Sequence, residues 1–238
     1  MKLLKITTCL CLGCATLTPL QSCDSGDIYP EENLQDTRTI TATFSFHHSS
    51  TIPTGRERKI ALAALASPDD LQPLRLERIS SAQDEDPVTI TLSSVPADAG
   101  TIALVLTNQN SEIMYTFFSR QIAGGTDDLS IEGGDIELAS FDRLQAQMFN
   151  LSCTSCHTSG NASAGLNLSE GNSYGMIVNK PSYKSDKLIV DPGNPSNSLI
   201  IDQLVDYEIG GFHTTLSTLR TEDITLLEVW VNNGAKND

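Results

Sequence analysis

The sequence has little positive charge. It carries 15 lysines and arginines against 30 aspartates and glutamates, which gives a formal net charge of −15. Such a surface repels the phosphate backbone, so nucleic acid is excluded as a partner. A protein partner that is steered to it electrostatically should present basic residues, and salt should weaken that steering. An acidic surface that only keeps an exported protein soluble explains the same composition.

Long apolar runs are also missing once the first 22 residues are passed. The rest of the sequence offers no stretch approaching the roughly 20 apolar residues of a membrane-spanning helix. Residues 1–22 have a basic start at Lys2 and Lys5, then an apolar stretch, and no acidic residue. This pattern predicts an export signal that forms no part of the fold.

The end of that segment carries a second signal. Leu20-Gln21-Ser22-Cys23 resembles the lipobox of bacterial lipoproteins, and Cys14 is a weaker candidate. The resemblance implies a lipid on Cys23 that attaches the chain to a membrane. It implies an outer membrane lipoprotein that faces the periplasm or the cell surface.

Cysteines are few once these roles are assigned. Of six cysteines, three fall in the export signal and Cys23 would carry the lipid, which leaves Cys153 and Cys156. A disulfide framework is therefore not expected, and a zinc site of four cysteines is excluded. A mixed zinc site would have to draw on the histidines, which are His47, His48, His157 and His213.

The two remaining cysteines belong to Cys153-Thr154-Ser155-Cys156-His157, a C-x-x-C-H run. This spacing is the attachment signature of c-type haem. Two thiols a helical turn apart can add to the two vinyl groups on one edge of a porphyrin, and His157 then becomes the proximal iron ligand. A zinc site and a redox dithiol begin with the same C-x-x-C and stay as alternatives.

Two kinds of pattern divide the rest of the chain. Residues 23–36 are polar and acidic and are expected to form a tether. Residues 37–139 alternate apolar and polar side chains between turn signals, which predicts an N-terminal all-β sandwich, with an immunoglobulin-like one as an option. From Ser140, an expected N-cap, the pattern becomes helical, and residues 140–238 are expected to form a second, haem-binding domain. Near its end, Thr221 is the expected cap of a helix with an apolar stripe that includes Leu227 and Trp230, and Gly234 is expected to end that helix.

The stretch from about Phe149 to Ala235 resembles the cytochrome c-like domains of many bacterial exported proteins. The match rests on C-x-x-C-H, on Pro192-Gly193-Asn194-Pro195-Ser196-Asn197-Ser198-Leu199 and on a C-terminal W-x-x-x-G-A ending. It implies an all-α fold of class I type, one covalent haem c, and a helix from Leu199 to Val205 capped by Ser196.

The resemblance also implies a methionine as the sixth iron ligand, and the corresponding stretch, residues 210–216, contains none. His213 lies in that stretch, so we expect coordination by His157 and His213. Met176 as the ligand, or an open sixth position, are the alternatives. Two imidazoles favour a lower reduction potential than a thioether ligand does.

These features together predict an exported, lipid-anchored monohaem cytochrome that transfers single electrons to and from redox partner proteins. No catalytic constellation of an enzyme is visible, so activity of its own is not expected. An alternative function is a surface lipoprotein whose β-sandwich binds a protein or glycan, with an accessory haem domain. A non-haem zinc module in the C-terminal part is a third possibility.

Overall fold

The computed structural model describes residues 36–238. The predicted export signal (residues 1–22), the lipidation site Cys23 and nearly all of the tether (residues 23–36) lie outside the described residues. Within residues 36–238, none of the helices has the length and apolar character needed to cross a membrane.

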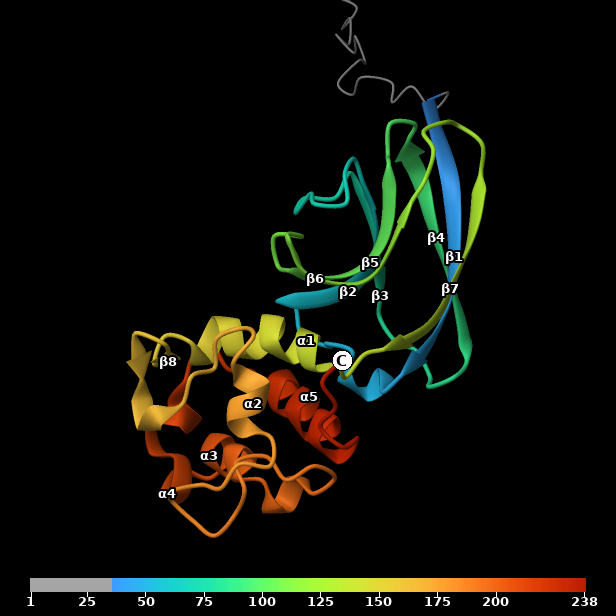
Figure 1. Ribbon diagram of the computed structural model, residues 1–238. Helices are drawn as coiled ribbons and strands as arrows, with labels where there is room; N and C mark the ends of the chain where they lie inside the picture. Colours follow the sequence, from blue (N-terminus) through green and yellow to red (C-terminus); the bar gives the residue numbers. More distant parts are fainter. Residues whose placement is uncertain (1–35) are drawn as a thin grey trace, which may run out of the picture. The chain divides into compact units, whose positions relative to one another are not determined.

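Three strands form the first sheet, with β1 (Thr37–His47) in the middle (Figure 1). It pairs antiparallel with β4 (Pro87–Pro96) and parallel with β7 (Leu129–Glu137). Every second side chain of β1 is buried, so the predicted alternation of this strand is confirmed.

Four antiparallel strands form the second sheet, in the order β3 (Arg75–Ile79), β2 (Arg58–Leu65), β5 (Thr101–Asn108) and β6 (Ile113–Gln121). The central strands β2 and β5 are buried along nearly their whole length. One face of this pair joins the hydrophobic cluster of the first sheet, and the other forms a small cluster with Ile113.

The two sheets face each other across their shared cluster. Phe44 of β1 meets Phe118 of β6 edge to face, with ring centroids 5.4 Å apart. A Cβ at Gly133 would lie 2.0 Å from the Phe44 ring, so only glycine fits that position of β7. The first, fourth and seventh strands share a sheet here, whereas an immunoglobulin sandwich groups the first, second, fourth and fifth. The strand grouping therefore differs from that of a constant-type immunoglobulin domain, while the two packed sheets fit the predicted N-terminal sandwich in part.

The prediction of an all-α domain for residues 140–238 is wrong. The helices there are short, and a hairpin of β8 (His157–Thr158) and β9 (Asn161–Ala162), isolated β-bridges and 3₁₀ turns lie between them. The helical elements are α1 (Phe141–Leu144), a π-helix (Gln145–Cys153), α2 (Ser173–Ile177), α3 (Leu199–Val205), α4 (Tyr207–Gly210) and α5 (Thr221–Asn232).

The sequence between β8 and α3 explains why longer helices do not form. It contains several glycines and three prolines, and each costs helix stability, about 1 kcal/mol for glycine and about 3 kcal/mol for proline. Backbone groups pair across the loops instead, as when the Ile189 N–H donates to the Lys180 carbonyl oxygen over 2.8 Å. The five-residue α2 is the one α-helix in this stretch, beside 3₁₀ turns at Ser163–Gly165 and Pro195–Asn197.

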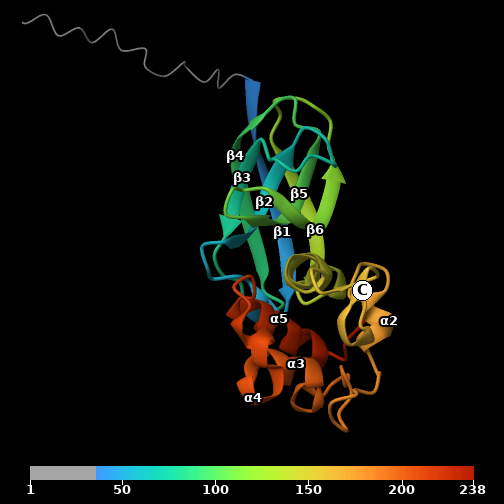
Figure 2. The same cartoon turned by 90° about the vertical axis from the view of Figure 1, so that its left-hand side faces the viewer.

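The C-terminal part has its own hydrophobic cluster, centred on α5, which packs beside α3 (Figure 2). Trp230 is 1% exposed and its Nε1–H donates to the Lys236 carbonyl oxygen over 2.8 Å. The predicted apolar stripe of α5 and its end near Gly234, with φ +90°, are confirmed. The N-cap is Arg220, one residue earlier than the expected Thr221.

Candidate functional site

The C-x-x-C-H run follows directly from the π-helix, whose last residue is Cys153. The predicted cap is confirmed, because the Ser140 Oγ accepts from the Arg143 N–H over 3.2 Å at the start of α1. The wide i→i+5 turns continue to the motif, where the Thr154 N–H donates to the Phe149 carbonyl oxygen over 3.0 Å. Such π-turns are uncommon and occur frequently at functional sites.

Buried polar side chains hold the π-helix in place. The Gln147 Nε2 donates to the Asp223 carboxylate over 2.8 Å, and its Oε1 accepts from the Arg143 Nε over 3.0 Å. Asp223 also pairs with Arg58 of β2, while Arg143 donates to the Thr51 carbonyl oxygen over 2.7 Å. Burial lowers the pKa of Arg143 to about 10, which leaves it charged at neutral pH. The helix that carries Cys153 is therefore fixed to α5 and to the β-region.

His157 stands in β8, with its ring oriented by the backbone. Its Nδ1 lies 3.0 Å from the Ser163 carbonyl oxygen, which can only accept, so Nδ1 carries the proton and donates. In the neutral imidazole, Nε2 then carries no proton and its lone pair is available. A metal-ligating histidine is commonly oriented in this way.

His213 has the same arrangement on a different element. It lies in the 3₁₀ turn Gly211–Thr215, and its Nδ1 lies 3.2 Å from the Gly210 carbonyl oxygen. A Cβ at Gly210 would sit 1.9 Å from the Gln203 carbonyl oxygen of α3, and Gly211 has φ +53°. The two glycines let the chain pass close to α3, which brings His213 to its position.

The two imidazoles are close neighbours. Their ring centroids are 6.0 Å apart and their planes differ by 19°, so the rings are stacked. With a metal–nitrogen bond of about 2.0–2.1 Å and a ring radius of about 1.1 Å, two imidazoles on one metal ion have centroids roughly 6.3 Å apart. The observed separation is close to that value, and ligation by both rings would further require each Nε2 to face the metal.

A cavity of about 480 Å³ opens beside these rings. Its walls are largely apolar, and they include Cys153, His157, His213 and Met176. Most of the apolar lining comes from the π-helix, from α3 and from the loops on either side of α2, namely Met148, Leu166, Leu168, Ile189, Leu199, Ile200 and Leu204. Its volume and its apolar lining suit a cofactor.

The two thiols of the motif differ in their surroundings. Both are free; Cys153 is partly buried on the cavity wall, and burial raises the pKa of its thiol to about 12. A thiol with a raised pKa is a poor thiolate nucleophile, unlike the cysteines of redox dithiols. Cys156 is exposed and is not part of the cavity lining. The structure therefore brings Cys153, His157 and His213 together and leaves the Cys156 side chain outside.

The donor set fits a haem better than a bare metal ion. Among residues 36–238, no three or more His, Cys, Asp or Glu side chains gather closely enough to hold a metal, whereas structural zinc takes four ligands. A porphyrin brings four nitrogens of its own, so its iron needs only two axial ligands from the chain. His48 is engaged elsewhere, because its Nδ1 pairs with the Glu137 carboxylate at 2.8 Å.

Three further residues on the cavity wall were missed from the sequence. They are Lys180, Tyr183 and Lys184, from the loop between α2 and α3. The sequence did contain one sign of the two lysines, because three of the lysines of this strongly acidic chain fall within eight residues.

No protein-family model matches this chain, and no curated protein matches it. Among solved structures it is similar to hydrazine synthase of Kuenenia stuttgartiensis, with 11% identity and a TM-score of 0.31. That alignment covers 84% of this chain and 43% of the other, so the chain spans less than half of that protein's length. A similarity of this size shows neither a common fold nor a common activity.

Proposed function

We propose that this chain is an exported c-type cytochrome with one covalent haem, which carries single electrons. The observation that supports this most is the pair of imidazoles, His157 and His213, 6.0 Å apart on the wall of an apolar cavity that also contains Cys153. The proposal depends on this site and its C-x-x-C-H run, and it assumes no all-α cytochrome fold.

Four side chains would hold the haem. Cys153 and Cys156 would form the thioether bonds, and His157 and His213 would be the axial ligands. Because Cys156 points away from the cavity, its attachment needs a rotation of that side chain toward the porphyrin edge. When bound, the haem supplies the reversible one-electron chemistry.

The chain's own groups set the conditions for that chemistry. The Ser163 and Gly210 carbonyl oxygens keep the protons of both imidazoles on Nδ1, which leaves each Nε2 as a ligand. The apolar walls exclude water and thereby influence the reduction potential. With both His157 and His213 as ligands, the bound haem would be suited to electron transfer more than to ligand activation.

The cellular setting follows from the sequence. The protein would be exported, anchored by a lipid on Cys23 in the outer membrane, and would exchange electrons with redox partner proteins at the periplasmic or cell-surface side. It would do so as a carrier, without catalysing a reaction of its own.

A redox titration of the exported protein tests this proposal. We expect a low-spin haem spectrum that converts between two forms with the slope of a one-electron couple. The His213→Ala variant, with Met176→Leu as the matched control, shows whether His213 is the second ligand. A protein with no haem absorption, or with bound zinc in elemental analysis, would contradict the proposal.

A further inference from the structure

The lysines of this chain are unevenly distributed. Beyond residue 36 there are five, and Lys180, Lys184 and Lys187 fall within one loop; the others are Lys59 and Lys236. The same chain has a net charge of −15. The loop between α2 and α3 therefore holds three of these five lysines, beside the two acidic residues Asp186 and Asp191, in an otherwise acidic protein.

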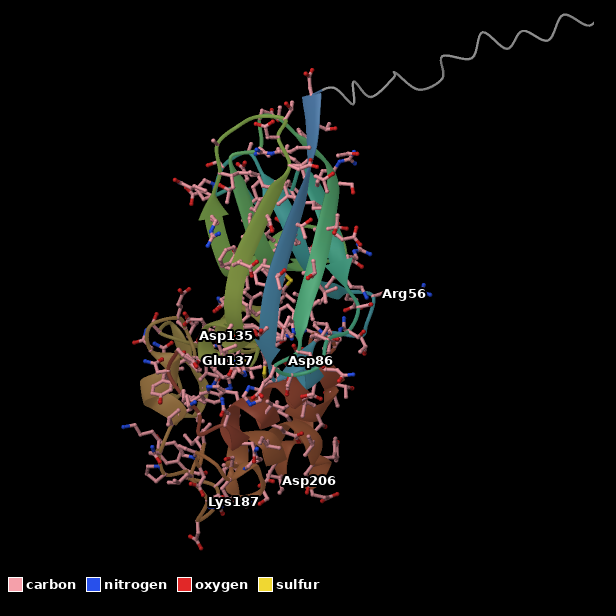
Figure 3. All side chains as sticks on the ribbon, turned by 90° about the vertical axis from the view of Figure 1, so that its right-hand side faces the viewer. Arg56, Asp86, Asp135, Glu137, Lys187 and Asp206 are labelled. Atoms are coloured by element: carbon pink, nitrogen blue, oxygen red, sulfur yellow. The ribbon has the colours of Figure 1, made fainter. Side chains whose placement is uncertain are left out.

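Two of these lysines face the cavity, whereas the third is already paired. Lys180 and Lys184 are part of the cavity lining. Lys187 donates to the Asp202 carboxylate over 2.7 Å and to the Ser196 carbonyl oxygen over 2.8 Å. Figure 3 shows it at the same end of the C-terminal region as Asp206. Lys187 thus stabilises the loop rather than serving a ligand.

The ammonium groups of Lys180 and Lys184 lack carboxylate partners among the described residues. Lys184 donates only to the neutral Gln203 amide oxygen, over 3.2 Å. The loop itself is ordered by hydrogen bonds, including Ser182 N–H to the Lys187 carbonyl oxygen and Lys184 N–H to the Ser182 Oγ. Two exposed lysines without a carboxylate partner among the described residues thus belong to the lining of a largely apolar cavity.

We propose that Lys180 and Lys184 bind the two propionate carboxylates of the haem, an inference that rests on the proposed function. A haem carries vinyl groups on one edge and carboxylates on another, so a cavity that binds it needs an anchoring side and a cationic side. Cys153 with His157 provides the first, and the lysine pair provides the second. Each ammonium–carboxylate contact is a charge-assisted hydrogen bond, and it strengthens where the apolar wall excludes water.

The same charges would affect the iron. Removing a positive charge near the haem favours the oxidised state, which carries one more positive charge. Variants that lose these lysines should therefore have a lower midpoint potential, and the pH at which that potential responds to carboxylate protonation should rise.

The test uses the exported holoprotein and the variants Lys180→Met, Lys184→Met and their combination, with Lys236→Met as the matched control outside the cavity. Midpoint potentials are measured at pH values from about 5 to about 9, so that the change of potential with pH can be followed. We expect the combined variant to show a lower potential and a displaced pH dependence, with each single variant in between and Lys236→Met unchanged.

A second readout does not require variants of the lysines. Acetylation with a water-soluble reagent, followed by peptide mass spectrometry, compares lysine reactivity in holoprotein and in the haem-free Cys153→Ala/Cys156→Ala protein. Lys180 and Lys184 should react several-fold more slowly in the holoprotein, and Lys236 equally in both. Should the haem-free protein not fold, the midpoint potentials of the holoprotein variants decide whether Lys180 and Lys184 bind the propionates.

The pyridine haemochrome spectrum of each sample separates the two claims. A protein without covalent haem would refute the proposed function itself. A protein with haem whose lysine reactivities and potentials are unchanged would overturn only the propionate assignment, and would leave this basic rim as a surface for an acidic protein partner.

Discussion

Asp223 is the charged side chain whose loss should destabilise the chain most. Its carboxylate is 0% exposed and accepts hydrogen bonds from the Arg58 guanidinium, the Gln147 amide at 2.8 Å and the Arg220 N–H at 2.9 Å. The Arg58 side chain is itself only 7% exposed. Asp223→Ala therefore leaves the buried Arg58 with only the more distant Glu222 carboxylate, at 3.5 Å, and leaves the Gln147 amide without its acceptor.

The size of this effect follows from the contacts. Breaking a buried ion pair by removing one partner costs about 3–5 kcal/mol of unfolding free energy. For a chain of this length each kcal/mol lowers the melting temperature by about 2–4 °C, so the decrease should be roughly 6–20 °C. Because Gln147 belongs to the π-helix that ends at Cys153, the same change should loosen the support of the motif.

Urea unfolding followed by circular dichroism measures this change, provided that the slope of the free energy against urea is the same in both proteins. Asp223→Asn keeps an acceptor and tests the charge alone, and we expect an intermediate loss. Glu222→Gln is the matched control, because Glu222 lies 3.5 Å from Arg58 and its change should amount to less than about 1 kcal/mol. A loss below about 1 kcal/mol for Asp223→Ala would refute this reasoning.

Other variants test the remaining parts of the account. His213→Ala should convert low-spin ferric iron to high-spin, and added imidazole should reverse this, whereas Met176→Leu should leave the visible and near-infrared spectra unchanged. Trp230→Ala, at a site 1% exposed, should cost about 3–5 kcal/mol in urea unfolding. Burial raises the pKa of Glu222 above its ordinary 4.5, so the folded state binds its proton more tightly than the unfolded state does, and stability should fall as pH rises through the region just above 4.5. Glu222→Gln should remove this part of the fall in melting temperature, and an identical pH profile in both proteins would contradict the assignment.

Local patterns in the sequence predicted local structure well. The alternation of β1, the Ser140 cap and the apolar stripe of α5 each depend on neighbouring residues, and the structure confirms them. The helix Leu199–Val205 is also confirmed, although Ser198 is its N-cap and Ser196 instead donates to the Asn194 side chain over 3.1 Å. Ser196 lies two residues before Ser198 in a turn that contains proline. In the sequence, both serines are therefore equally good candidates for the N-cap of this helix.

The arrangement of elements could not be predicted in this way. The pairing of β1 with β4 and β7 depends on contacts between distant residues, which no local pattern records. The all-α prediction failed because it relied on a resemblance confined to motifs, while the glycines and prolines between those motifs prevent long helices. The π-helix has no sequence signature, since its buried glutamines resemble surface residues.

The candidate site likewise combines residues that the sequence pattern identified with residues that only the folded structure brings together. The spacing of Cys153, Cys156 and His157 was visible in the sequence, because attachment chemistry requires adjacent residues. His213 was chosen by its position in a loop, and the structure places its ring 6.0 Å from that of His157. The position of Lys180 and Lys184 on the cavity wall could not be predicted, because only the folded loop brings them there.

The intact mass of the exported protein under denaturing conditions tests the central claim most directly. The account predicts a mature chain heavier by one haem, with the added mass absent from the Cys153→Ala/Cys156→Ala variant. A correctly exported chain whose mass contains no haem, produced in cells that attach haem to a known c-type cytochrome, would contradict it.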